Sequence, residues 1–211
     1  MQRLTKGEKT RAAVLHEAVR IASKLGLEGL TIGSLAEATG MSKSGLFAHF
    51  GSREELQLAV LERGREKFGE AVLIPALAKP RGVPRLRAAF ANWLDWTESA
   101  ELPGGCVMLG AAVEFDDQPG AVRDRVSALQ REWMESLART VRGAIEEGHL
   151  RRDTDVEQFV FECFGIALVC HHHRRLFGDK RARIRALAAQ DALIARHAGK
   201  TPASRLRAVS R

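Results

Sequence analysis

The chain has 211 residues, 45% of them hydrophobic, enough for the core of one large domain or two small ones. It has no apolar run of about 18 residues and no apolar segment near its start, so we expect neither a transmembrane helix nor a secretion signal. The three cysteines, Cys106, Cys163 and Cys170, are odd in number and do not form a disulfide pattern. We therefore expect the reducing cytoplasm as the location.

The net charge of +7 is unevenly distributed. Residues 1–53 carry 8 basic and 4 acidic side chains, residues 54–173 carry 14 and 20, and residues 174–211 carry 11 and 2. A basic N-terminal segment suits a polyanion, whereas the acidic middle argues against a nonspecific DNA-packaging protein. The basic C-terminal part is interpreted as a solvated helix face followed by a flexible tail at 199–211.

The first predicted element is a helix over residues 8–25, which Gly26 ends. Its apolar side chains form one stripe at helical spacing: Val14, Ala18, Ile21, Ala22 and Leu25. We expect this helix to support the two that follow.

Residues 31–50, TIGSLAEATGMSKSGLFAHF, have the pattern of a helix-turn-helix. Thr31 is the expected N-cap of a helix that ends at Thr39, Gly40 supplies the tight turn, and Ser42 caps a second helix that ends at Phe50.

The two faces of this pair are expected to differ. Four residues would face a shared core: Leu35, Ala36, Leu46 and Phe50. Six would stay largely outside: Ser42, Lys43, Ser44, Gly45, Phe47 and His49. An apolar back with a short polar front fits the major groove of DNA. The alternative is a purely structural helical hairpin, which shares the caps, the turn glycine and the apolar back.

Residues 10–56 resemble the DNA-binding domain of the TetR family of bacterial transcriptional repressors. The glycine, cap, turn and aromatic-His-Phe positions match together in GLEGLTIGSLAEATGMSKSGLFAHFGSREEL. The resemblance implies an all-α fold, with an N-terminal three-helix helix-turn-helix domain at 1–53 and a helical ligand-binding and dimerisation domain at 54–198. Residues after about 70 match the family only in architecture.

The resemblance also implies which residues contact or flank DNA: Thr31, Ser42, Lys43, Ser44, Gly45, Phe47, His49 and Arg53. Thr31 and Arg53 would lie near phosphates, and Arg53 stands where the family usually has lysine. The family commonly has tyrosine at the position of Phe47, and this chain contains no tyrosine, so a phosphate-binding hydroxyl is missing. Apolar contact with a thymine methyl and simple packing remain alternatives for Phe47.

Beyond residue 53 the pattern predicts further helices, and no segment has a convincing strand pattern. Pro75 is expected to stop the first of these helices, and Asp155 to cap a later one. The expected ranges are 54–74, 84–100, 107–114, 119–148, 155–177 and 180–197.

The helix over 155–177 is apolar on nearly all sides, so it must be covered on most of them. The resemblance implies that residues 155–197 form the interface of a homodimer. The alternative is that they close the core of a single subunit. A homodimer would present two reading helices to a palindromic operator.

An aromatic and sulfur-rich group is expected to surround a pocket for an unidentified small hydrophobic effector, although an ordinary packed core is the alternative. Its members are Phe90, Trp93, Trp96, Cys106, Met108, Phe115, Trp133 and Phe164, with His171 as a neighbouring polar group. The consecutive histidines 171–173 diverge around a helix. Cys170 and His173 could share a face, but no carboxylate or further cysteine lies at suitable spacing, so we expect no metal and no cofactor.

The competing class of function is an enzyme. The chain has no nucleophile elbow, phosphate-binding glycine loop, HExxH motif or paired-cysteine zinc pattern. We therefore expect a sequence-specific, DNA-binding transcriptional repressor that a small hydrophobic ligand releases from its operator.

Overall fold

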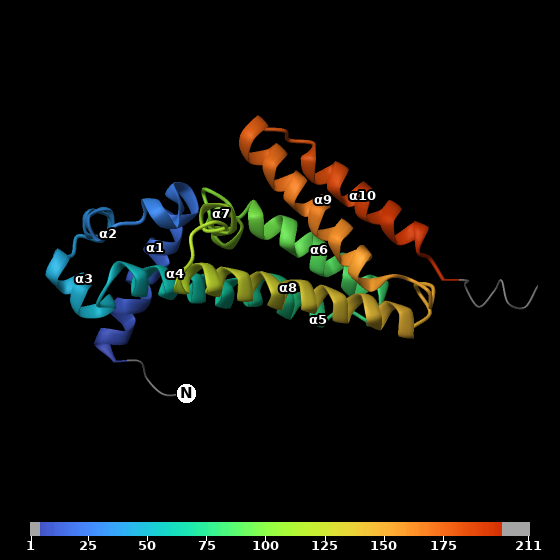
Figure 1. Cartoon of the computed structure of the whole chain (residues 1–211), viewed down its shortest axis with the longest axis horizontal. Helices are drawn as coiled ribbons and strands as arrows, with labels where there is room; N and C mark the ends of the chain where they lie inside the picture. The colour runs from blue at the N-terminus through green and yellow to red at the C-terminus, as the bar shows by residue number, and fades with distance from the viewer. Residues whose placement is uncertain (1–4, 200–211) are drawn as a thin grey trace, which may run out of the picture. The chain divides into compact units, whose positions relative to one another are not determined.

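The computed structural model describes residues 5–199, and Figure 1 shows that helices make up most of this stretch. The all-α fold expected from the sequence is confirmed. None of the helices within 5–199 has the length and hydropathy needed to cross a membrane. The helices are α1 (Lys6–Gly29), α2 (Ile32–Thr39), α3 (Lys43–Phe50), α4 (Arg53–Phe68), α5 (Ile74–Leu77), α6 (Val83–Thr97), α7 (Val107–Glu114), α8 (Ala121–Glu146), α9 (Val156–Phe177) and α10 (Ala182–Arg196).

The chain packs as two compact units. Among the described residues, one unit contains 5–68 and 96–130, and the other contains 69–95 and 131–199. This division describes packing. The expected division by function, 1–53 and 54–198, stays a prediction, and the tail expected at 199–211 lies outside the described residues except for Gly199.

The first helix runs beyond its expected end. A capping box starts α1, because the Thr5 side chain accepts from the Glu8 amide at 3.2 Å while the Glu8 carboxylate accepts from the Thr5 amide at 2.7 Å. Gly26 is not helical, with φ 81° and ψ 166°, as a residue without Cβ allows. The helix therefore kinks where the sequence predicted its end, and a short helical segment continues to Gly29.

The predicted helix-turn-helix is confirmed with its expected helix bounds. Thr31 accepts from the Ser34 amide at 3.0 Å, and Ser42 accepts from the Gly45 amide at 3.1 Å. Gly40 is left-handed at φ 66°, as expected for the turn. On the inner face Leu35 and Leu46 are fully buried, Phe50 is buried and Ala36 is half-buried.

The expectation that Pro75 stops a helix is wrong. After α4 the chain makes a π-helical turn, Gly69–Leu73, and then enters α5 directly. Pro75 lies in the first turn of α5, where a backbone N–H would have no partner within the helix. The proline therefore fits the start of a helix here.

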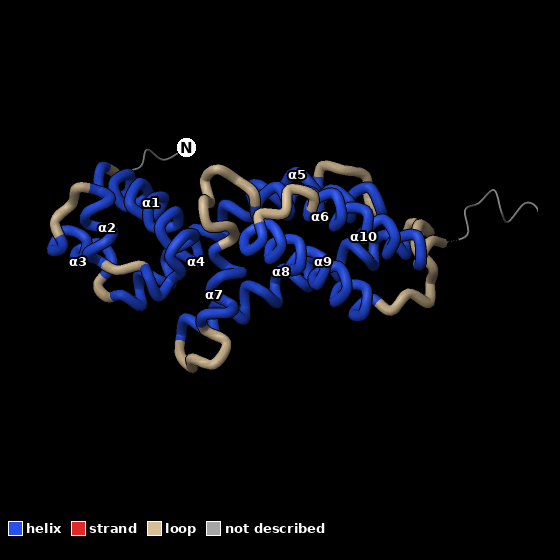
Figure 2. The backbone as a smooth tube through the Cα atoms, turned by 90° about the horizontal axis from the view of Figure 1, so that it is seen from above, coloured by secondary structure: helices blue, strands red, loops and turns tan. Residues whose placement is uncertain are grey.

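The later helices follow the predicted order. Helices α7 and α9 have the expected bounds apart from the cap residue Asp155, which accepts from the Gln158 amide at 3.0 Å. Helices α6, α8 and α10 differ from the expected ranges by one to three residues at their ends. Gly178, left-handed at φ 63°, ends α9, and α10 then packs beside α9 (Figure 1). Figure 2 shows the short loops that join these helices.

The burial of α3 gives a stability prediction. Leu46→Ala should lower the free energy of unfolding by about 2–5 kcal/mol, because it removes buried methyl groups and leaves a cavity. Phe47→Ala is the matched control, since this neighbouring side chain is 50% exposed and its loss should change stability by less than about 0.5 kcal/mol. Urea denaturation of both variants measures the difference, and equal losses would contradict the packing described.

Candidate DNA-binding surface and effector-binding core

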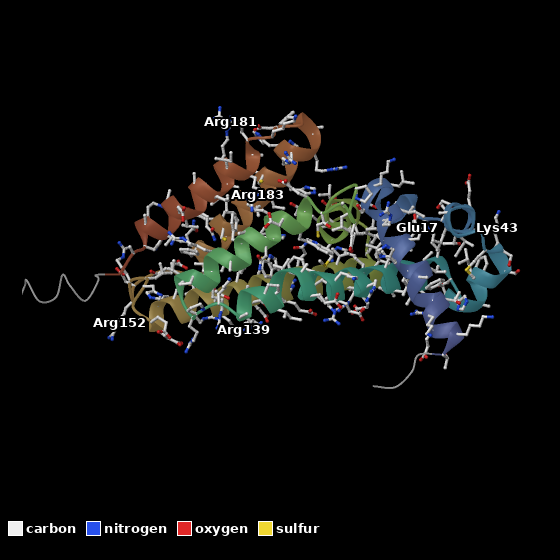
Figure 3. The ribbon with its side chains drawn as sticks, turned by 180° about the vertical axis from the view of Figure 1, so that it is seen from behind. Glu17, Lys43, Arg139, Arg152, Arg181 and Arg183 are labelled. Atoms are coloured by element: carbon white, nitrogen blue, oxygen red, sulfur yellow. The ribbon has the colours of Figure 1, made fainter. Side chains whose placement is uncertain are left out.

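The start of α3 presents short polar side chains and one cation to solvent. Ser42, Lys43 and Ser44 are exposed, and Figure 3 labels Lys43 on α3. The two serine hydroxyls lie 3.2 Å apart. The first turn of α3 contains no acidic residue, so the positive end of the helix dipole adds to the charge of Lys43. Such a helix start favours an anionic partner.

The remaining predicted α3 residues differ in exposure. Phe47 is half exposed, which places it outside the core, whereas Gly45 and His49 are each half-buried. The His49 ring lies 6.3 Å from that of Phe50, so the imidazole packs partly over the apolar face. The exposed front of α3 is therefore narrower than the sequence predicted.

Thr31 and Arg53 have partners within the protein. The Thr31 hydroxyl caps α2, although the residue remains exposed. Arg53 at the start of α4 donates to the Glu28 carbonyl oxygen, and its guanidinium lies 3.3 Å from the Glu28 carboxylate. Sequence reasoning missed this contact because the residues are 25 positions apart and share no local pattern. The Arg53 side chain is still about half exposed, so it can also reach a phosphate.

The predicted effector-binding residues fall into both packing units. In the second unit, the Trp93 ring lies 6.3 Å from Phe90, 5.2 Å from Trp133 and 5.4 Å from Phe164. Trp93 is only 1% exposed, and aromatic pairs in these tilted or edge-on arrangements stabilise a core. Four of the nine predicted residues therefore meet around Trp93.

His171 belongs to the same unit but has a different character. Burial lowers its pKa, and the positive charges of Arg175 and His172 lower it further. Its Nε2 atom is buried and has no hydrogen-bond partner among residues 5–199. A neutral, partly buried imidazole with an unused nitrogen can accept or donate one hydrogen bond to a polar atom of a ligand.

The other predicted effector residues lie in the first unit. Trp96 packs edge-on against Phe68 at 6.0 Å between ring centroids, and Met108 and Phe115 are buried. Burial raises the pKa of the Cys106 thiol. All three cysteines are free and buried, and burial raises the pKa of Cys163 to about 12. These thiols are therefore poor nucleophiles in the folded protein.

Helix α9 has two apolar faces with different surroundings. One face is buried in its own unit: Phe159, Val160, Cys163, Ala167 and Cys170. The other is exposed to solvent: Phe161, Leu168, Val169 and Leu176. Between α9 and α10 lies a groove of about 350 Å³, lined by residues that include Ile166, Val169, Cys170, His173, Ala186 and Ala189. A large apolar surface of this kind typically marks an interface.

Across residues 5–199, no cluster of three or more His, Cys, Asp or Glu side chains is placed to hold a metal ion. The histidines 171–173 instead make other contacts. His173 lies 3.6 Å from the Asp179 carboxylate, and His172 and His173 both pack edge-on against Phe177.

Two family descriptions match the chain. "Bacterial regulatory proteins, tetR family" matches residues 14–60, and "Tetracyclin repressor-like, C-terminal domain" matches residues 82–190. The chain therefore belongs to the TetR family, as its first helices suggested. This places it among regulatory proteins and not among enzymes.

Individual relatives agree with this assignment. The HTH-type transcriptional repressor AcnR of Corynebacterium efficiens is 38% identical over 63 residues, which are 30% of this chain and 34% of AcnR. The chain thus matches only about a third of the length of that curated relative.

Solved structures extend the similarity over nearly the whole fold. The crystal structure of a TetR transcriptional regulator from Chloroflexus aurantiacus has a TM-score of 0.85 and 26% identity, over 93% of this chain and 99% of that one. A structure of AibR in complex with isovaleryl coenzyme A and operator DNA has a TM-score of 0.67 and 23% identity, over 88% and 96% of the two chains. The second likeness concerns the fold alone.

Proposed function

We propose that this protein is a sequence-specific, DNA-binding transcriptional regulator that acts as a repressor. The observation that carries the proposal is the exposed, cationic start of α3 in a TetR-family helix-turn-helix. The opposite side of this helix pair is anchored by Leu35 and Leu46, which are fully buried. A short helix anchored from behind and polar in front matches the requirement for entry into the major groove.

The proposed DNA contacts keep the eight residues predicted from the sequence. Lys43 and Ser44 are the reading residues because both are exposed on the first turn of α3, with Ser42 and Gly45 beside them. Thr31 and Arg53 lie at the starts of α2 and α4, where exposed donors can contact phosphates. Phe47 and His49 flank the groove, and Phe47 offers an apolar surface to a thymine methyl group.

The expected DNA-binding behaviour separates reading from positioning. Lys43→Ala should change the preferred base sequence as well as the affinity, because base contacts carry specificity. Arg53→Ala should weaken all duplexes alike and reduce the slope of log K against log salt by about 0.9, since one phosphate contact is lost. Selection from random duplexes, followed by titration at several salt concentrations, measures both effects.

Arg139→Ala is the charge-matched control for these variants. This exposed residue lies on α8 in the other packing unit (Figure 3), so its loss should leave base preference unchanged. Equal affinity of the unaltered protein for all duplexes at moderate salt would contradict the proposed function.

We further propose that the active form is a homodimer that uses the exposed apolar face of α9 and α10 within residues 155–197. The support is the unequal division of α9, whose inner face already closes its own unit while Phe161, Leu168 and Val169 stay exposed. Ile184 of α10 is also exposed, and the groove between the two helices can receive side chains from a second copy. A twofold dimer would present two α3 helices to a palindromic operator, with half-sites about one helical turn apart.

The dimer proposal predicts the effect of a charge on this face. Phe161→Glu should shift the protein to monomers, because burying the unpaired carboxylate costs about 3–5 kcal/mol. Val113→Glu is the control: Val113 is exposed to 76% and Phe161 to 74%, but Val113 lies on α7. Sedimentation velocity distinguishes the two variants. A Phe161→Glu protein that remains dimeric would place the interface elsewhere.

We also propose that a small hydrophobic ligand releases the repressor from DNA. The support is the aromatic group around Trp93 together with the Nε2 of His171, which has no hydrogen-bond partner among residues 5–199. The aromatic rings could contact the apolar part of a ligand, and the imidazole could form a hydrogen bond with its polar atom. The AibR structure, a fold neighbour, contains both isovaleryl coenzyme A and operator DNA, so a protein of this fold can bind a small acyl ligand as well as DNA.

The ligand proposal predicts linked optical and binding responses. An apolar compound that enters beside Trp93 should shift tryptophan emission and weaken operator binding, since coupling between two sites is typically about 1–3 kcal/mol. Trp133→Phe should reduce the optical response, because Trp133 contacts Trp93, whereas Trp96→Phe should retain it. Compounds that shift emission without changing operator affinity would contradict the coupling.

A further inference from the structure

The kink in α1 leaves backbone groups that the helix cannot satisfy. Gly26 interrupts the helical dihedral angles, so the amides of Leu27 and Glu28 begin a new helical segment. The first amides of a helical segment have no carbonyl partner within it. Leu27 is fully buried, so its amide needs a partner from elsewhere in the protein.

Glu114, the last residue of α7, supplies that partner. Its Oε1 accepts from the Leu27 amide at 3.2 Å, and its Oε2 accepts from the Glu28 amide at 2.9 Å. Each carboxylate oxygen is therefore matched to one amide, and hydrogen bonds to an ionised acceptor are stronger than neutral ones. The contact joins residues 86 and 87 positions apart.

The shape of the kink fits this carboxylate closely. A Cβ on Gly26 would lie 2.4 Å from Glu114 Oε1, in addition to the strain of its φ of 81°. A second contact lies just before it on α1. The Gly104 amide donates to the Ser23 hydroxyl at 2.8 Å, and a Cβ on Gly104 would lie 1.5 Å from the Ser23 carbonyl oxygen. Two glycines thus allow residues 104–114 to approach the end of α1.

The same corner is bound to the start of α4. Gln57, which is buried, donates from Nε2 to the Leu27 carbonyl oxygen at 3.0 Å. Arg53 donates to the Glu28 carbonyl oxygen. The corner of residues 26–28 therefore lies between the end of α7 and the start of α4, and Thr31, the N-cap of α2, follows three residues later.

We infer that Glu114 is a positioning residue for DNA binding: its carboxylate holds the corner of residues 26–28 and thereby sets the start of α2 and the guanidinium of Arg53. The DNA part of this inference rests on the proposed function. Helix α7 also carries Met108 and lies between Cys106 and Phe115, three of the effector residues predicted from the sequence.

Glu114→Gln tests the inference because it keeps the shape but replaces one accepting oxygen with an NH₂ group. Hydrogen exchange of the Leu27 and Glu28 amides should become about tenfold faster. Affinity for the selected operator should fall about tenfold at a temperature where the variant is fully folded. Asp117→Asn is the matched control, since it removes the same charge from an exposed residue just after α7 and should change neither measurement.

A double-mutant cycle with Arg53→Ala distinguishes positioning from general stabilisation. If Glu114 acts through the corner that holds Arg53, the loss of operator affinity in the double variant should be smaller than the sum of the losses in the two single variants, expressed as binding free energies. A purely structural role would lower the free energy of unfolding and leave the affinity of the folded protein unchanged.

Each outcome decides a separate point. Unchanged exchange at Leu27 and Glu28 would overturn the inference whatever happens to DNA binding. Faster exchange with unchanged or strictly additive operator affinities would overturn the positioning role and leave the proposed function intact. An unaltered protein that binds no duplex would overturn the proposed function and the DNA part of the inference. The exchange result would then report on the Glu114 contact alone.

Discussion

The structure of the helix-turn-helix depends on the burial of a set of leucines beneath it. Helices α2 and α3 have only 8 residues each, and isolated helices of that length are marginal in water. Packing must therefore hold them. Five fully buried leucines provide it, from α1, α2, α3, α4 and the loop that follows α1: Leu27, Leu30, Leu35, Leu46 and Leu56. A rigid apolar back is what allows the front of α3 to remain small, polar and exposed.

Two other parts of the chain also combine a buried apolar core with groups that the core leaves unused. One apolar face of α9 is buried in the core of its own unit, so the second, exposed apolar face is available to another subunit. In the aromatic group Trp93 packs against three other rings, and the buried Nε2 of His171 has no hydrogen-bond partner in the described part of the chain. Surfaces and polar atoms that the fold does not use for itself are the places where partners and ligands are expected.

Local sequence signals predicted much of this accurately. Caps at Thr31, Ser42 and Asp155 gave the starts of three helices and the turn at Gly40 gave the end of α2, because each signal acts within four residues along the chain. The same reasoning failed at Pro75, where a proline permits the start of a helix as readily as it prevents continuation. Because proline is compatible both with the first turn of a helix and with the position after a helix ends, Pro75 alone does not show which of the two applies.

The helical pattern, the exposed polar start of α3 and the family of the protein could all be predicted from the amino-acid sequence. The long-range contacts could not be predicted in this way: Glu114 with the amides after Gly26, Arg53 with Glu28, and Trp93 with Trp133. The physical reason is the range of the interactions. Caps and helical periodicity act between neighbours, whereas a carboxylate that satisfies amides 86 residues away depends on how whole helices pack.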